Sequence, residues 1–158
     1  MEKKLVAVFS PTGRTLQAAR ELAAAEHAAL FEIRPDVPYS AADLDWTNSN
    51  SRTSLEEKDA GCRPVLAQET APVKDSQVIF LGFPIWWYTC PRIIHSFLES
   101  YDFAGKTVIP FATSGGSTLD RAEAEIRAAL PQARVLPGLL MNRHYSEQQL
   151  KEWAEHLN

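Results

Sequence analysis

Short apolar segments alternate with segments of helical periodicity along most of this 158-residue chain, and no other feature constrains its fold as strongly. Residues 5–9 form a continuous apolar run, as expected of a strand buried on both faces, and residues 14–26 follow with helical spacing. The same order recurs toward the C-terminus. Because right-handed crossovers place helices over both faces of a parallel sheet, the alternation predicts a doubly wound α/β fold.

The remaining elements follow from the same patterns. Further strands are predicted at residues 28–33, 77–82, 107–112 and 134–140. Further helices are predicted at residues 91–101, at residues 119–130 and from residue 146 onward. Pro91 suits a first helical position, and Ser146 with Gln149 has the spacing of a capping box. Pro137 and Gly138 interrupt the last strand, which therefore suits a short or bent edge strand.

The segment between the second and third predicted strands is too long for a simple crossover, so we expect it to hold structure of its own. Ser40 and Asp43 predict the start of a short helix that continues to Trp46. A second short helix is predicted behind a capping-box pattern at residues 54–57. Residues 47–54, between the two, have a turn-like composition.

Composition and charge narrow the class of protein. A chain of this length with 45% hydrophobic residues suits one globular domain, predicted over residues 1–158. A net charge of −4 argues against nucleic-acid binding. Cys62 and Cys90 form no CxxC pair and no leader is recognisable, which favours a reduced, cytoplasmic setting and leaves a disulfide between them open. No apolar run approaches the ~18 residues that cross a membrane, so we expect a soluble protein.

Polar residues behind the predicted strands mark a candidate site, since ligands bind at the carboxyl ends of such strands. The first group is Ser10-Pro-Thr-Gly-Arg-Thr15, directly ahead of a helix. Hydroxyls beside a glycine, followed by the free N–H groups of a helix start, form a cradle for a phosphate. Ordinary helix capping by Thr12 or Thr15 is the alternative. The Walker A and GxGxxG patterns are absent, which disfavours those two kinds of nucleotide site.

Two further loops follow the third and fourth predicted strands. Residues 82–88, GFPIWWY, suit a wall for a flat aromatic ligand, unless the tryptophans cover the core or form a partner interface. Residues 113–117, TSGGS, let the main chain approach a ligand, unless the loop is a plain turn in which Ser117 caps a helix. Together, a phosphate cradle, an aromatic wall and a glycine loop describe a mononucleotide with a flat ring. They point to flavin mononucleotide (FMN).

These loops resemble those of the flavodoxin family, in particular its branch with a WWY loop. The similarity is carried by FSPTGRT (9–15), LGFPIWWYTCPR (81–92) and IPFATSGGS (109–117), and also by SAADLDW (40–46), SRTSLEE (51–57) and SFLESYDFAGKTVIPF (96–111). It implies a flavodoxin-like, five-stranded parallel sheet of order 2-1-3-4-5 with helices on both faces. It also implies FMN held noncovalently at the strand ends.

By matching motif positions, the resemblance implies three groups of FMN-binding residues. The phosphate would be bound by Ser10, Thr12, Gly13, Arg14 and Thr15. The isoalloxazine ring would be bordered on one side by Pro84, Ile85, Trp86, Trp87 and Tyr88, and on the other by Thr113, Ser114, Gly115, Gly116 and Ser117. Arg14 stands where the family often has asparagine, and we expect its amide, not its guanidinium, to meet the phosphate.

No catalytic acid, base or nucleophile and no metal site is predicted. Metal-ligand spacing is missing around His27, His95, His144 and His156. Cys90 is interpreted as a small packing residue and not as a redox thiol. Trp46 and Arg52 stay outside the predicted site. Two interpretations remain for them: they fold over the flavin or a neighbouring subunit, or they pack on a solvent-facing helix.

The resemblance implies an electron carrier in which the flavin does the chemistry and the protein sets its potentials. Such a carrier shuttles electrons between redox partner proteins, docks through an acidic rim, and is expected to be a monomer or weak dimer. An FMN-dependent NAD(P)H or quinone reductase is the alternative, because a net charge of −4 is mild for a dedicated carrier. A third interpretation is a domain that kept the fold and lost the cofactor.

Overall fold

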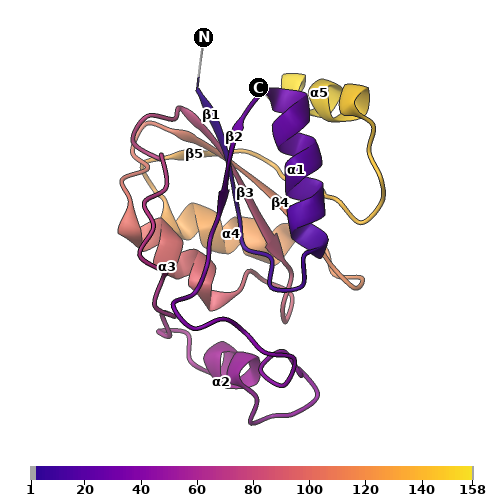
Figure 1. Cartoon of the computed structure of the whole chain (residues 1–158). Helices are drawn as coiled ribbons and strands as arrows, with labels where there is room; N and C mark the ends of the chain where they lie inside the picture. Colours follow the sequence, from indigo (N-terminus) through magenta and orange to yellow (C-terminus); the bar gives the residue numbers. More distant parts are fainter. Residues whose placement is uncertain (1–2, 158) are drawn as a thin grey trace.

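A single parallel sheet organises the computed structural model, which describes residues 3–157 (Figure 1). Its strands are β1 (Lys4–Val8), β2 (Ala29–Glu32), β3 (Val78–Pro84), β4 (Thr107–Thr113), β5 (Arg134–Val135) and β6 (Leu139–Leu140). They pair in the order β2-β1-β3-β4-β5, and β6 also pairs with β4. The predicted order 2-1-3-4-5 is therefore confirmed, with a sixth short strand added.

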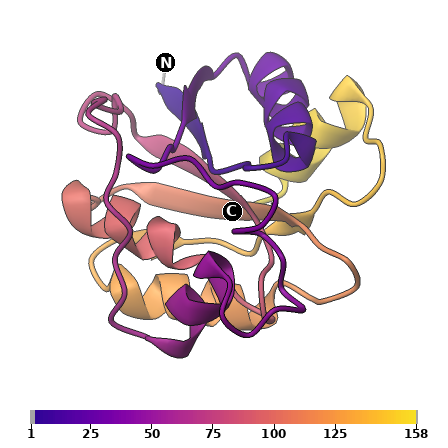
Figure 2. The ribbon, with the colours of Figure 1, turned by 60° about the horizontal axis from the view of Figure 1, so that its bottom comes forward.

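Helices cover both faces of this sheet, as predicted (Figure 1). They are α1 (Arg14–Glu26), α2 (Arg52–Lys58), α3 (Arg92–Ser100), α4 (Asp120–Ala129) and α5 (Glu147–Glu155). α1 and α5 lie on one face, and α3 and α4 lie on the other. α2 lies beyond the carboxyl ends of the strands, on the α3 and α4 side when that end is viewed (Figure 2). There the Arg92 guanidinium donates to the Glu57 carbonyl at 2.8 Å.

The apolar runs of the central strands are continuous because both of their faces are covered. Successive side chains of a strand point to opposite faces, so Leu5 packs into the core under α3 and α4, whereas Val6 packs into the core under α1 and α5. The parallel register pairs Val8 with Gly82, and Pro84 with Thr113. As a result, the loops that follow β1, β3 and β4 emerge side by side at one edge of the sheet.

The final strand is interrupted as its sequence predicts. β5 and β6 are separate two-residue strands on either side of the Pro137-Gly138 step. A Cβ on Gly138 would lie 2.3 Å from the Pro110 carbonyl oxygen, so only glycine allows this approach to β4. The predicted capping box of α5 is also confirmed, because Gln149 N donates to Ser146 Oγ and Ser146 N donates to Gln149 Oε1.

The structure corrects three predicted helix starts. No helix forms at residues 40–46. The Ser40 and Asp43 side chains each accept a hydrogen bond from the other residue's backbone amide, and turns follow, because short polar side chains satisfy the backbone locally. α2 begins three residues earlier than residues 54–57 predict, and Ser51 is its N-cap, with its hydroxyl accepting from Ser54 N. Pro91 is the N-cap of α3 and not its first helical residue.

Candidate functional site

The loop between β1 and α1 (residues 10–15, the first loop) is shaped by Gly13. This residue is the N-cap of α1 and has φ 90°, a left-handed conformation that favours glycine. Ser10 Oγ accepts a hydrogen bond from Leu16 N at 3.0 Å, which ties the start of the loop to the helix. Thr12 and Thr15 do not cap α1, so the predicted alternative of threonine capping is wrong.

Backbone N–H groups gather in this loop without protein acceptors. Within residues 3–157, no acceptor is found for the amides of Ser10, Thr12, Gly13, Arg14 and Thr15. The positive end of the α1 dipole lies at the same place. Unpaired amides at a helix start, exposed to solvent, form a site for an anion such as a phosphate.

Two side chains of the first loop join it to the loop behind β4 (residues 113–117, the glycine loop). Thr15 is buried, and its Oγ1 lies 2.8 Å from Thr113 Oγ1. The guanidinium of Arg14 reaches the Ser114 carbonyl oxygen and Asn142 Oδ1, both at 3.4 Å. The Arg14 side chain therefore faces the glycine loop, which leaves its amide free for a ligand of the first loop.

Asn142 holds the glycine loop in place, and sequence reasoning missed it. Its Oδ1 accepts from Ser114 N at 2.7 Å, and its Nδ2 donates to Ser114 Oγ at 3.1 Å. Ser114 Oγ in turn donates to the Ser117 carbonyl at 2.8 Å. Asn142 follows β6 and belongs to no recognisable motif, so only the folded arrangement identifies it.

The loop behind β3 contains a tight hairpin (residues 86–89, the WWY hairpin). Trp86 N donates to the Thr89 carbonyl at 2.9 Å, and Thr89 N donates to the Trp86 carbonyl at 3.1 Å. Trp87 and Tyr88 between them have φ 48° and 69°, as in a type I′ turn. Left-handed backbone costs about 1 kcal/mol or more at each non-glycine residue. Strain of this kind concentrates at functional sites.

The two tryptophans of the hairpin occupy different environments. Trp86 packs edge-on against Phe9 and Tyr39, with ring centroids 5.5 and 5.8 Å apart. Trp87 is half-buried, and Tyr88 is 67% exposed. The structure therefore supports part of each predicted interpretation, because Trp86 packs against the core and, together with Trp87 and Tyr88, also lines a cavity.

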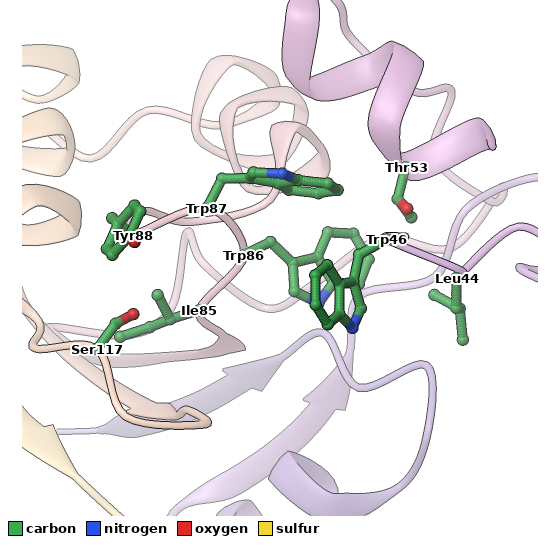
Figure 3. Close-up of a pocket in the computed structure, with 8 residues that line it drawn as sticks. All are labelled: Leu44, Trp46, Thr53, Ile85, Trp86, Trp87, Tyr88 and Ser117. Atoms are coloured by element: carbon green, nitrogen blue, oxygen red, sulfur yellow. The ribbon is translucent and has the colours of Figure 1, made fainter. Parts of the chain in front are cut away.

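A cavity of about 360 Å³ opens beside this hairpin (Figure 3). Its lining consists of Leu44, Trp46, Thr53, Ile85, Trp86, Trp87, Tyr88 and Ser117. The volume falls within the usual range of small-molecule sites. Thr53 extends from α2 toward Trp46 and Trp86, and its buried Oγ1 has no hydrogen-bond partner within the described residues.

The comparisons with known proteins agree with this architecture. The family profile described as Flavodoxin matches residues 3–157. The chain belongs to the flavodoxin family. No curated protein matches it significantly.

Three solved structures similar to this flavodoxin-family chain come from Bacteroides and Lactobacillus species. A protein of Bacteroides eggerthii DSM 20697, named as a candidate flavoprotein, is 41% identical with a TM-score of 0.95, covering 99% of this chain and 98% of its own. Its counterpart from Bacteroides uniformis ATCC 8492 is 45% identical with a TM-score of 0.91, covering 98% of each chain. A flavoprotein from Lactobacillus acidophilus NCFM, crystallised with FMN, shares the fold at 16% identity and a TM-score of 0.73, covering 98% of this chain and 99% of its own.

The fifteen predicted site residues fall into three sets of five in the flavodoxin-family fold. Five of them line the cavity: Ile85, Trp86, Trp87, Tyr88 and Ser117. The first loop carries Ser10, Thr12, Gly13, Arg14 and Thr15. The other five do not line the cavity: Pro84 ends β3, Thr113 and Ser114 are buried, and Gly115 and Gly116 are exposed. Assignment of these fifteen residues to a ligand stays a prediction.

The long crossover contributes three lining residues that the predicted site lacks, namely Leu44, Trp46 and Thr53. Trp46 is 73% exposed, so it stands at the cavity's open side and does not pack into the core. Nothing in the local sequence pattern specifies that this segment folds back over the strand ends. The first of the two interpretations of Trp46, folding toward the site, is the one that the structure supports.

Arg52 has a different role from Trp46. Its guanidinium lies 3.8 Å from the centre of the Tyr39 ring and donates to Glu56 Oε2 at 3.2 Å. Tyr39 Oη donates to Glu56 Oε1 at 2.6 Å, and burial together with this hydrogen bond raises the Tyr39 pKa well above its usual value. This network ties α2 to the ring that packs against Trp86, so Arg52 positions the crossover without lining the cavity.

Two further properties bear on the chemistry of the site. Cys62 and Cys90 are free thiols, and burial raises the pKa of Cys90 to about 12. A thiol in that state is a poor nucleophile near neutral pH. Among the described helices, none is long and apolar enough to cross a membrane.

Proposed function

We propose that this flavodoxin-family protein binds FMN noncovalently and transfers electrons between redox partner proteins. The proposal rests on one observation: five loop amides without acceptors lie at the same edge of the sheet as an aromatic cavity. A ligand that needs both features has an anionic group and a flat ring. FMN is such a ligand, and FMN is bound in the Lactobacillus acidophilus flavoprotein that shares this fold.

The first loop fits the phosphate of FMN. Its amides would donate to the phosphate oxygens, aided by the α1 dipole and the Thr12 hydroxyl. Arg14 would contribute its amide, because its guanidinium is engaged by Ser114 and Asn142. Its positive charge would still attract the anion from a distance.

The aromatic cavity fits the isoalloxazine ring. Trp46, Trp87 and Tyr88 would offer faces and edges for stacking, while Trp86 forms a floor fixed by the core. The unpartnered Thr53 hydroxyl would bond a polar atom of the ring, which removes the cost of leaving it buried and unsatisfied. Glycine-loop amides beside Ser117 would bound the opposite side of the ring.

The residue types that line the cavity favour electron transfer over catalysis. Its lining residues include no carboxylate, histidine, lysine or cysteine, so they supply no group that would move a proton near neutral pH. Bound FMN would supply the redox chemistry itself. Exposed Trp46 and Tyr88 would mark the face on which a redox partner protein docks. Free thiols favour a cytoplasmic setting for this exchange.

The alternative is an FMN-dependent NAD(P)H or quinone reductase. The open, apolar side of the cavity beside Trp46 favours it, because a flat substrate would enter there. Anaerobic mixing of the FMN-loaded protein with NADPH and a quinone separates the two functions. A carrier stays yellow until a partner reductase is added, whereas rapid bleaching without a partner would establish the reductase.

Cofactor binding is tested by titrating flavin-free protein with FMN and with riboflavin, which lacks the phosphate. We expect FMN to bind at least ~100-fold more tightly, because the phosphate adds several charge-assisted hydrogen bonds. Quenching of flavin fluorescence measures both dissociation constants. Equal affinities would remove the first loop from the site, and no binding of either flavin would show a domain that has lost the cofactor.

A further inference from the structure

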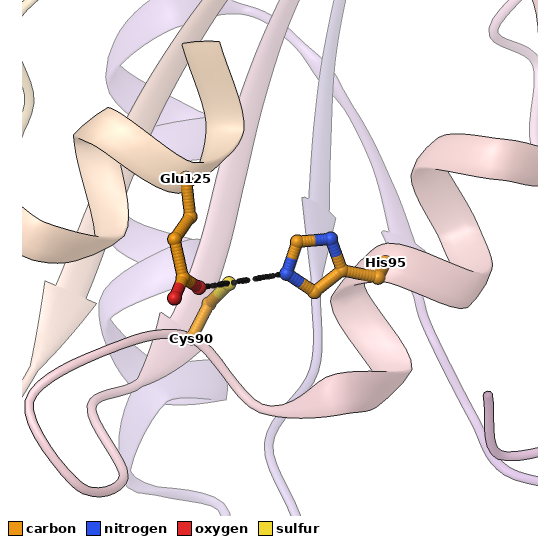
Figure 4. A group of neighbouring side chains, drawn as sticks. All are labelled: Cys90, His95 and Glu125. Carbon is orange, nitrogen blue, oxygen red and sulfur yellow. Dashed lines mark hydrogen bonds and ion pairs between the residues drawn. The ribbon is translucent and has the colours of Figure 1, made fainter. Parts of the chain in front are cut away.

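Three side chains with metal-binding atoms converge between α3 and α4, apart from the aromatic cavity (Figure 4). Cys90 comes from the segment ahead of α3, His95 from the first turns of α3, and Glu125 from the middle of α4. Cys90 Sγ lies 3.8 Å from His95 Nε2 and 3.9 Å from Glu125 Oε2. His95 Nε2 lies 3.5 Å from Glu125 Oε2.

The size of this triangle is close to that of a shared metal site, and each Cys90 contact is also within the hydrogen-bond distance of sulfur. Hydrogen bonds from nitrogen to oxygen close to about 2.7–3.2 Å, which is shorter than the His95–Glu125 separation. Around tetrahedral zinc, with metal–ligand bonds of about 2.0–2.3 Å, the ligand atoms lie about 3.3–3.6 Å apart. The His95–Glu125 separation falls within this range, and the two Cys90 separations exceed it by a few tenths of an ångström.

Charge and access also suit a divalent cation. On metal binding, the Cys90 thiol would release its proton to solvent, and the resulting thiolate and the Glu125 carboxylate would balance the two charges of the ion. A neutral imidazole completes a set that zinc prefers. Cys90 is buried, while the side chains of His95 and Glu125 are 13% and 27% exposed, so the group opens to solvent on one side. Solvent on that side would supply the fourth ligand.

Neighbouring groups hold the carboxylate in place. Thr89 Oγ1 donates to Glu125 Oε2, and the Arg121 guanidinium lies 3.8 Å from Glu125 Oε1. In known metal sites, hydrogen bonds and ion pairs of this kind orient the side chains that bind the metal. Thr89 also closes the WWY hairpin, so an ion here would connect the base of that hairpin to α4.

We propose that Cys90, His95 and Glu125 form a three-ligand site for a zinc-type divalent cation, with water in the fourth position. The site is separate from the proposed function and does not depend on flavin binding. Spacing along the chain conceals it, because Glu125 belongs to a different helix from His95 and only the fold brings the two together. The expectation of no metal site rested on that spacing.

The test is a titration of the purified protein, stripped of metal, with Zn²⁺ by calorimetry and with Co²⁺ by absorption spectroscopy. We expect one ion per chain. Co²⁺ should give ligand-field absorption bands of tetrahedral type at the red end of the visible spectrum, where oxidised flavin does not absorb. The variants Cys90→Ala, His95→Asn and Glu125→Gln should each lose at least ~10-fold in Zn²⁺ affinity, since even outer-shell changes cost that much. Cys62→Ser and Glu123→Gln are matched controls and should bind as the unchanged protein does.

An unchanged circular dichroism spectrum and an unchanged thermal unfolding midpoint without metal show that each variant is folded. Glu125→Gln, the most solvent-exposed change of the three, keeps the test decisive if Cys90→Ala fails to fold. Absence of stoichiometric Zn²⁺ binding to the unchanged protein would overturn the proposal. Binding that survives both His95→Asn and Glu125→Gln would overturn it as well, and neither outcome would bear on the affinity for FMN.

Discussion

The first loop and the aromatic cavity are built in opposite ways, although both lie at the same edge of the sheet. The first loop is a run of consecutive residues, 10–15, and its unpaired groups are backbone amides. The cavity draws side chains from the long crossover, the WWY hairpin and the glycine loop. An amide site depends on local backbone shape, whereas the cavity depends on packing between distant segments. Mutations should therefore act differently on the two.

The largest effect is expected where the cavity meets the core. Trp86→Ala removes the edge-on contacts with Phe9 and Tyr39 and should lower the free energy of unfolding by about 3 kcal/mol. Trp87→Ala, the matched control in the same hairpin, should cost less than about 1 kcal/mol because no such ring packing is lost. Urea unfolding of the flavin-free proteins measures both values. Equal losses would show that the two tryptophans share one structural role.

The same contrast explains how far sequence reasoning reaches. The strands and α1 were predictable because continuous apolar runs and helical spacing are local signals, and the first loop lies between two such elements. Trp46 was not assigned to the site, because no local rule fixes where a long crossover folds back. Residues 40–46 were predicted as helix from the residue types at Ser40 and Asp43. These two residues do hydrogen-bond to each other, but the bonds close only a turn.

Residues that act across the chain were the ones that sequence reasoning missed or left unexplained. Asn142 lies far in sequence from Ser114, which it holds by two hydrogen bonds. Tyr39 reaches Trp86 and Glu56 from a segment without regular structure. Pairings of this kind depend on tertiary contacts, so residue type and spacing do not reveal them.

The link between the crossover and the cavity should be sensitive to pH. Tyr39→Phe removes the hydrogen bond to the Glu56 carboxylate and should lower the free energy of unfolding by about 2 kcal/mol at pH 7. Because the Tyr39 pKa is raised in the folded state, its stabilisation is complete below the unfolded value of about 10 and falls as pH rises above it. Denaturation curves between neutral and alkaline pH should show this extra decline in the unchanged protein only. A decline of the same size in Tyr39→Phe would assign it to another group.

The first loop should respond through its backbone. Gly13→Ala places a Cβ on a residue with φ 90°, which strains the loop without meeting any neighbour. FMN affinity should fall about tenfold, because the amides turn away from the phosphate. Riboflavin affinity, measured by the same fluorescence titration, should stay unchanged. An equal loss for both flavins would show that the first loop and the cavity are coupled.

Because the WWY hairpin is strained, we expect Tyr88 to lower the stability of the protein while it contributes to FMN affinity. At Tyr88, φ is 69° and most of the side chain is exposed, so glycine relieves strain that alanine keeps. Tyr88→Gly should therefore be about 1 kcal/mol more stable than Tyr88→Ala, and both should bind FMN equally weakly. Thermal unfolding compares their stabilities and fluorescence titration their affinities. Greater stability of Tyr88→Ala would show that the left-handed turn is not strained.

The smallest effect should have opposite signs with and without the cofactor. Thr53→Val keeps the shape of the side chain and removes a buried hydroxyl that has no partner, so flavin-free protein should gain up to about 1 kcal/mol of stability. If that hydroxyl bonds the ring, FMN affinity should fall several-fold in the same variant, while Thr53→Ser should retain most of it. Urea unfolding without flavin measures the change in stability, and titration with flavin measures the change in affinity. A gain in both would mean that Thr53 faces the cavity without touching the ligand, and that packing alone, not a polar contact, fixes the ring on this side.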